Sequence, residues 1–164
     1  MAPARAVLVK LVVPQVARRA AQKAVQRVAP LGGRLDQAPP KAGDNLDMRV
    51  RFEKLYSVEL CRAHPDEIFV FGDNLIHAGQ RKGAGQAEIR FEPNVCGIPT
   101  KRLPSTKEEA YFTDQDDELK AVRDALANLY RLGKTKRLVF PLDGIGTGRA
   151  KMSEKSQKAW AYLN

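Results

Sequence analysis

A run of apolar, β-prone residues that stops at a glycine constrains the fold of this chain most. The run is Ile68-Phe-Val-Phe71, and Gly72-Asp-Asn74 follows it directly. Four consecutive residues of this kind predict a strand buried on both faces, as in the centre of an α/β sheet. A second small-residue cluster, Gly83-Ala-Gly-Gln-Ala87, opens a short helix expected over 85–91. The stretch therefore predicts a strand, a polar loop and a helix, the kind of junction at which α/β proteins hold anionic ligands.

A second junction of the same kind lies near the end of the sequence. Residues 137–142 predict another buried strand, and Asp143-Gly-Ile-Gly-Thr-Gly148 follows it. Residues 94–100 predict a third short strand, with Lys101 directly after it. The carboxyl ends of parallel strands meet at one edge of a sheet. We therefore expect the two glycine-rich loops to face each other across one ligand site.

The remaining patterns complete an alternation of strands and helices. Apolar residues alternate within 49–62 and predict a strand there. Residues 114–132 predict the longest helix, with an acidic first turn and Gly133 after its end. A terminal helix is expected over 153–163. This order predicts an α/β fold class, as a single compact domain of three layers with a mostly parallel or mixed central sheet.

The beginning of the sequence differs in composition from the rest. Residues 1–28 combine small apolar residues with Arg and Lys and hold no acid, and residues 29–47 are rich in Pro and Gly. We expect a basic extension and linker over 1–47 and a folded domain over 48–164. Seven of the nine net positive charges fall within 1–43. Such an arm is typical of a transit peptide, of a membrane-surface or nucleic-acid contact, or of a solvated extension.

Cysteine, histidine and hydropathy patterns argue against several kinds of site. Cys61 and Cys96 lie in apolar contexts without CxxC spacing, which predicts buried reduced thiols rather than a disulfide or a metal pair. Two histidines, His64 and His77, are too few for a His-rich metal site, and neither a metal nor a cofactor is expected. No apolar run approaches the roughly 20 residues that span a bilayer. A cytoplasmic location is the expectation.

Glycines and polar residues at the strand ends are the predicted ligand-binding residues. Loops without Cβ atoms let backbone N–H groups approach a phosphate closely. The predicted set is Gly72, Gly83, Gly85, Gln86, Thr100, Lys101, Gly144, Gly146, Thr147 and Gly148. Neither loop has the Gly-Lys-Ser/Thr ending of a P-loop or the third glycine of G-x-G-x-x-G. Tight turns without a ligand are the alternative interpretation.

Three residues that directly follow the strands are the predicted catalytic residues: Asp73, Asn74 and Asp143. Asparagine offers a donor and an acceptor, which suits a ribose hydroxyl, and a carboxylate can activate water. A local turn closed by the Asn or Asp side chain is the alternative for Asp73 and Asn74. Arg90 lies one helical turn after Gln86 and faces either the crevice or solvent. No Ser/His/Asp or Cys/His arrangement can be argued.

Four segments together resemble an uncharacterised domain family of bacteria and their phages. They are Arg62 to Leu75, Gly83 to Ala87, Glu92 to Lys101 and Asp143 to Ala150. The resemblance covers about residues 48–164 and implies no particular activity.

A more distant resemblance is to macro domains, which bind ADP-ribose and related nucleotides and sometimes hydrolyse ADP-ribosyl bonds. It rests on Phe71 to Leu75 with Gly83 to Ile89, and on Val139 to Gly148. It implies that Asn74 meets the distal ribose and that Gly146, Thr147 and Gly148 meet the diphosphate. The doubled asparagine of macro domains is Asp-Asn here, so the resemblance implies binding more than hydrolysis.

The sequence thus predicts binding of a phosphorylated nucleoside, such as ADP-ribose or an NAD-derived metabolite, at two glycine-rich loops. Whether the ligand is also hydrolysed stays open. One alternative is a nucleic-acid-associated module, or one that contacts an acidic surface, through the basic residues 1–43. Another is a phage or host interaction protein whose glycine loops are only structural.

Overall fold

Strand β2 (Glu67–Asn74) lies inside the sheet of the computed structural model, which describes residues 49–79 and 82–163. All of its residues are buried except Gly72. The strand order is β1-β4-β2-β3 and every neighbouring pair is parallel. The other strands are β1 (Val50–Glu53), β3 (Val95–Lys101) and β4 (Arg137–Pro141). The predicted α/β fold class is confirmed, with a sheet that is entirely parallel.

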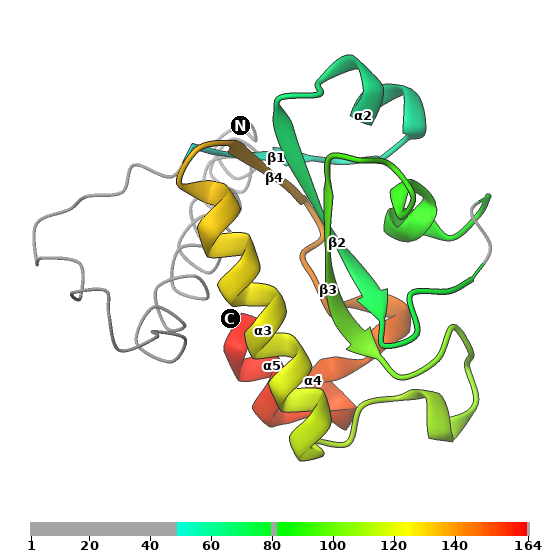
Figure 1. Cartoon of the computed structure of the whole chain (residues 1–164). Helices are drawn as coiled ribbons and strands as arrows, with labels where there is room; N and C mark the ends of the chain where they lie inside the picture. The colour runs from blue at the N-terminus through cyan, green and yellow to red at the C-terminus, as the bar shows by residue number, and fades with distance from the viewer. Residues whose placement is uncertain (1–48, 80–81, 164) are drawn as a thin grey trace, which may run out of the picture.

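The larger core lies on one face of the sheet, under helices α3 (Asp116–Gly133) and α5 (Gln157–Leu163). Figure 1 shows both helices on the same side of the strands. A capping box between Gln115 and Glu118 and an acidic first turn fix the start of α3. Its apolar stripe recurs at helical spacing and is buried: Leu119, Val122, Leu126 and Leu129.

The smaller core lies on the opposite face, where α2 (Val58–Ala63) and the 3-10 helix η1 (Gly85–Ile89) pack. Phe69 and Phe71 point into it, whereas their neighbours along β2 point into the larger core, because side chains alternate along a strand. Figure 1 shows α2 on the other side of the sheet from α3. Helices on both faces explain why the strands read as continuous apolar runs.

Three expected elements differ from the structure. The helix expected over 85–91 is the 3-10 helix η1, which ends at Ile89. Within 49–62 only β1 is a strand, and α2 follows it because Ser57 caps the helix by accepting a hydrogen bond from the Leu60 N–H. The terminal helix expected over 153–163 is two helices, α4 (Met152–Lys155) and α5. Asp114 accepts hydrogen bonds from Ser156, Lys158 and Ala159, so a residue distant in sequence caps the start of α5.

Both predicted thiols are free and buried, as expected. Burial raises the pKa of Cys61 and of Cys96 to about 11, so both stay protonated near neutral pH. Within the described ranges, no helix is long and apolar enough to cross a bilayer. The predicted extension and linker, residues 1–47, fall outside the described residues.

Candidate functional site

Strands β2 and β4 pair only along their first residues. Their register runs from Glu67 opposite Arg137 to Phe69 opposite Val139 and goes no further. Beyond it β2 stays with β3, and β4 stays with β1. Continuing the register would place Pro141 opposite β2, and proline has no N–H to donate. The carboxyl half of the sheet is therefore divided between β2 and β4.

The chain leaves these two neighbouring strands toward opposite faces. After β2 it runs to η1, which belongs to the smaller core, and after β4 it runs to α4 and α5, which belong to the larger core. In open α/β sheets, ligands bind outside the carboxyl ends of strands at such a reversal. The division between β2 and β4 is thus the position at which the topology would place a ligand.

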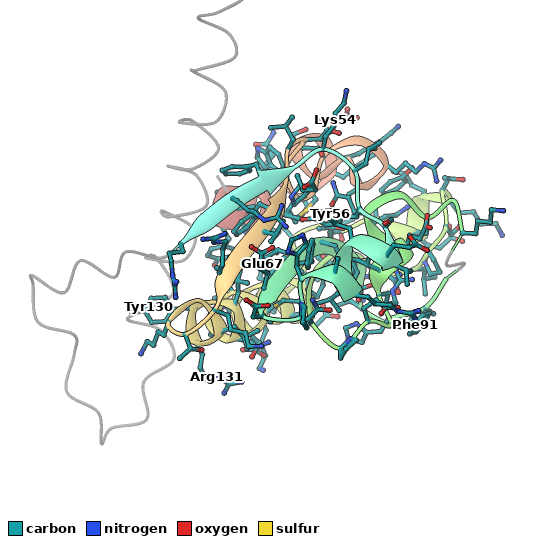
Figure 2. The ribbon with its side chains drawn as sticks, turned by 90° about the horizontal axis from the view of Figure 1, so that it is seen from above. Lys54, Tyr56, Glu67, Phe91, Tyr130 and Arg131 are labelled. Atoms are coloured by element: carbon teal, nitrogen blue, oxygen red, sulfur yellow. The ribbon has the colours of Figure 1, made fainter. Side chains whose placement is uncertain are left out.

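The hydroxyl of Tyr56 lies where the two strands part. Its oxygen is 2.9 Å from the carbonyl oxygen of Val70 and 2.8 Å from that of Val139, so it donates across the division. The ring packs edge-on against Phe69, with centroids 5.6 Å apart. Burial raises the pKa of Tyr56 far above its ordinary value, so the hydroxyl keeps its proton. Figure 2 shows Tyr56 within the fold, whereas Tyr130 lies at its rim.

The side-chain amide of Gln86 joins the two glycine-rich loops. Its oxygen accepts a hydrogen bond from the Gly72 N–H at 3.3 Å, and its nitrogen donates to the Gly144 carbonyl oxygen at 3.0 Å. Gly72, which was predicted to lie in a loop, is part of β2, so Gln86 of η1 connects this strand to the glycine-rich loop after β4. The two hydrogen bonds of Gln86 thus bring the start of η1, β2 and the loop after β4 together at one edge of the sheet.

The glycines of the loop after β4 are required for different structural reasons. Gly144, Gly146 and Gly148 all have positive φ angles, which favour glycine. A Cβ atom on Gly146 would lie only 2.5 Å from the sulfur of Met152, so packing explains this glycine. A Cβ atom on Gly148 would have nothing within 4 Å. Space is therefore open beside Gly148 and closed beside Gly146.

Exposed backbone donors lie in the same loop. Thr147, Gly148 and Arg149 are exposed, and their N–H groups have no acceptor within the described part of the chain. Gly83 and Gly85, before and at the start of η1, also combine positive φ angles with open space. The predicted glycines thus include several that border open space at this edge.

Asp73 is buried and fully engaged. Its carboxylate accepts hydrogen bonds from Arg90 Nε at 2.8 Å and from the Asn74 N–H at 2.8 Å, and its other oxygen lies 2.8 Å from His77 Nδ1. A Cβ atom on Gly97 would lie 2.8 Å from that oxygen, so β3 needs a glycine here. Arg90 is buried as well, and no described residue pairs with its Nη1.

Asn74 uses its side chain to close the loop that follows β2. Its amide nitrogen donates to the Ala78 carbonyl oxygen at 2.7 Å, and its amide oxygen accepts from the Ala78 N–H at 3.2 Å. Asp143 differs from both β2 residues, because it is exposed and hydrogen-bonds to no described residue. Of the three predicted catalytic residues, Asp143 alone has a free side chain.

The remaining predicted residues lie at the end of β3, beside β2. The Thr100 hydroxyl donates to the Asp73 carbonyl oxygen at 3.0 Å and is buried. Lys101 follows, donates to the Ser105 carbonyl oxygen, and lies over the ring of Tyr111 with its nitrogen 4.5 Å from the centroid. Burial and the charge of Arg149 lower the pKa of Lys101. The end of β3 thus lies beside the end of β2 and borders the candidate site on that side.

Residues of two kinds at this edge were not predicted from the sequence. Tyr56 reaches Val139 across 83 residues, and nothing local indicates that contact. Arg149 directly follows the glycine-rich loop, and Lys151 lies two residues further on. Two positive charges so close to a predicted phosphate-binding loop could have indicated these residues. No group of three or more His, Cys, Asp or Glu side chains that could hold a metal is found in residues 49–79 and 82–163.

The comparisons with known proteins give one match. The model of a family of unknown function, DUF7831, matches residues 51–164. This range includes both glycine-rich loops and all four strands apart from Val50, the first residue of β1. No curated protein and no solved structure matches. Because the match covers well over half of the sequence, the chain belongs to the family of unknown function DUF7831.

Proposed function

We propose that the edge between β2 and β4 binds a phosphorylated nucleoside, with ADP-ribose or another NAD-derived metabolite as the leading candidate. The observation that carries this proposal is the division of the sheet between these strands, with both glycine-rich loops at its carboxyl end. Parallel α/β sheets use this position for ligands of this class. The distant resemblance to macro domains favours ADP-ribose within the class.

The phosphates are assigned to the loop after β4. Exposed N–H groups at Thr147, Gly148 and Arg149 offer donors that no described residue uses, and the open space beside Gly148 admits a ligand. Successive backbone N–H groups of this kind form concave anion sites. Lys101 adds a positive charge at the adjoining end of β3.

The ribose is assigned to the neighbourhood of Asn74 and Asp143. The amide of Asn74 is bonded to Ala78, so we propose that Asn74 acts mainly by shaping the loop that faces the ribose. The exposed carboxylate of Asp143 is available to accept hydrogen bonds from ribose hydroxyls.

Hydrolysis of the bound ligand is the second part of the proposal. It needs a base that can activate water. Asp73 is already paired with Arg90 and His77, whereas Asp143 is exposed. Asp143 is therefore the proposed base, and Asp73 a residue that holds the end of β2 in place.

Calorimetric titration of the full chain with ADP-ribose, NAD, AMP and adenosine tests the binding proposal. We expect heat with ADP-ribose and a weaker response, or none, with adenosine, which lacks phosphate. A Gly148→Val variant should weaken binding, because a β-branched residue is strained at a φ of +54 and fills the open side of the loop. The absence of heat across the whole panel would reject the proposal.

A second candidate rests on the concentration of charge within residues 1–43. Eight Lys and Arg residues against a single acid favour contact with phosphate backbones. If the chain is a nucleic-acid-associated module, deleting residues 1–43 should abolish DNA or RNA binding in a salt-dependent shift assay. Binding that survives the deletion would argue against this function.

A further inference from the structure

Three lysine ammonium groups surround the ring of Tyr111. The Nζ atoms of Lys101, Lys151 and Lys155 lie 4.5, 5.9 and 5.7 Å from the ring centroid. All three charges thus lie within 5.9 Å of one point. They come from the end of β3, from the residue between the 3-10 helix η3 (Gly148–Ala150) and α4, and from the end of α4. We call these four residues the Tyr111 cluster.

The fold fixes the centre of this cluster. Tyr111 is buried and pairs with Lys101 through an isolated antiparallel bridge, so the ring and the end of β3 form one unit. Lys151 has a φ of +49, a left-handed conformation that is uncommon for a residue with a side chain. The backbone therefore holds a lysine in a strained conformation beside the ring.

The charges of the cluster are only partly balanced. Glu108 pairs with Lys155, and Glu154 lies close enough to raise the pKa of that lysine further. Within the described part of the chain, no carboxylate pairs with Lys101, with Lys151 or with the neighbouring Arg149. Burial and, to a smaller extent, the positive charge of Arg149 lower the pKa of Lys101.

Positive charges gathered around one ring favour the binding of an anion, because like charges repel one another and an anion offsets that repulsion. The cluster also borders the proposed phosphate loop directly. Arg149 follows Gly148 directly and Lys151 lies two residues further on, so the exposed N–H groups of Thr147 to Arg149 and the Lys151 side chain belong to one short stretch of chain. Ammonium groups and backbone N–H groups in combination suit the oxygens of a phosphate.

We propose that the Tyr111 cluster, together with Arg149, binds a diphosphate group. This deepens and rests on the proposed nucleotide site, since the diphosphate belongs either to a bound nucleotide or to free pyrophosphate. Lys151 and Arg149 supply the charges that no described residue neutralises, and the Tyr111 ring keeps the lysine stems in place. Both ends of a diphosphate are charged, which matches a cluster with more than one unpaired cation.

A double variant, Lys151→Asn with Lys155→Gln, tests the cluster. Asparagine tolerates the left-handed backbone at position 151 better than most residues, so the change removes charge with little added strain. The matched control is Lys120→Asn on α3 with Lys134→Gln directly after this helix, which removes two exposed lysines. One of them, Lys134, lies 5.1 Å from the ring centroid of Tyr130, so the control also removes a lysine over an aromatic ring. Thermal unfolding confirms that each variant is folded.

The full chain and both variants are titrated by calorimetry with pyrophosphate, ADP-ribose, adenosine and a single-stranded oligonucleotide. We expect the cluster variant to weaken pyrophosphate and ADP-ribose binding at least about tenfold, as for the loss of charge-assisted hydrogen bonds. The control variant should bind both like the unmodified chain. Equal losses in both variants would overturn the proposal, because they would indicate general attraction to surface charge.

Two further outcomes separate this proposal from the nucleotide proposal. Unchanged ADP-ribose affinity in the cluster variant, with no pyrophosphate binding by the full chain, would reject the cluster and leave the nucleotide site standing. Pyrophosphate binding that depends on the cluster, without any nucleotide binding, would support the cluster and reject the nucleotide. Weakened binding of the oligonucleotide alone would assign the lysines to nucleic acid and overturn the diphosphate proposal.

Discussion

Gln86 donates a hydrogen bond from its side-chain amide to the carbonyl oxygen of Gly144 at 3.0 Å, although 58 residues separate the two in sequence. The same amide accepts a hydrogen bond from Gly72. One side chain of η1 thus links Gly72 within β2 to the loop that follows β4. The site depends on this contact because β2 and β4 do not pair at that level of the sheet.

Replacing Gln86 should affect both stability and ligand binding. Gln86→Ala leaves the Gly72 N–H and the Gly144 carbonyl without their partner, and we expect a loss of about 1–2 kcal/mol in unfolding free energy. ADP-ribose affinity should fall as well, because β2 and the loop after β4 are no longer linked by the Gln86 side chain. Urea unfolding and calorimetry measure the two effects. Gln157→Ala, at an exposed position of α5, is the control and should change neither; equal behaviour of the two variants would contradict this role.

Replacing Tyr56 should destabilise the division between the strands. Tyr56→Phe removes the hydroxyl that donates to the carbonyl oxygens of Val70 and Val139, at the level where the pairing of β2 with β4 ends. We expect a loss of about 1–3 kcal/mol, the range for a buried acceptor left unsatisfied. Urea unfolding measures it. Tyr130→Phe, at the rim of the molecule in Figure 2, should be close to neutral, and a similar loss there would contradict the argument.

The two strand-end carboxylates should behave differently. Asp73→Asn leaves the buried charge of Arg90 uncompensated, and we expect a loss of about 3–5 kcal/mol in unfolding free energy. Asp143→Asn removes an exposed carboxylate and should leave stability unchanged while abolishing any hydrolysis of ADP-ribose. Thermal unfolding and chromatography of the reaction products measure the two effects. Full hydrolysis by Asp143→Asn would reject Asp143 as the base.

The sequence predicted the sheet edge better than it predicted the contacts across it. Ile68 to Phe71 could be assigned to a strand because helices cover both faces, so both sets of alternating side chains are apolar. The meeting of the two glycine-rich loops followed from parallel topology alone. The Tyr56 contacts could not be predicted, since they join residues far apart in the chain.

The orientations of Gln86 and Arg90 also depended on a detail that the sequence pattern does not show. An α-helix over 85–91 would place residues four apart on one face, which left both side chains facing either the crevice or solvent. The structure has a 3-10 helix that ends at Ile89, with a tighter repeat. Gln86 therefore contacts the loops, whereas Arg90 turns to Asp73.

An ion-pair group secures β2 and β4 at the end opposite the site. Glu67, at the start of β2, accepts hydrogen bonds from Arg51 Nε of β1 at 2.9 Å and from Arg137 Nη1 of β4 at 3.3 Å. The hydrogen bond from Arg51 is the main reason that the pKa of Glu67 is lowered. The strands are thus joined by charge at their amino ends, where they pair, and divide toward their carboxyl ends, where the candidate site lies.

This lowered pKa predicts an acid-dependent loss of stability. A carboxylate whose pKa is lower in the folded chain stabilises the fold above its unfolded value of about 4.3, and this stabilisation disappears as the pH falls through the folded value. Glu67→Gln should cost about 1–3 kcal/mol at pH 7, because Arg51 and Arg137 lose their charged partner. The difference between the unmodified chain and Glu67→Gln should then shrink steadily as the pH is lowered below about 4.3. Urea unfolding across this pH range measures it, with Glu109→Gln, an exposed position, as the control. A difference that stays constant with pH would show that Glu67 contributes through packing rather than through its charge.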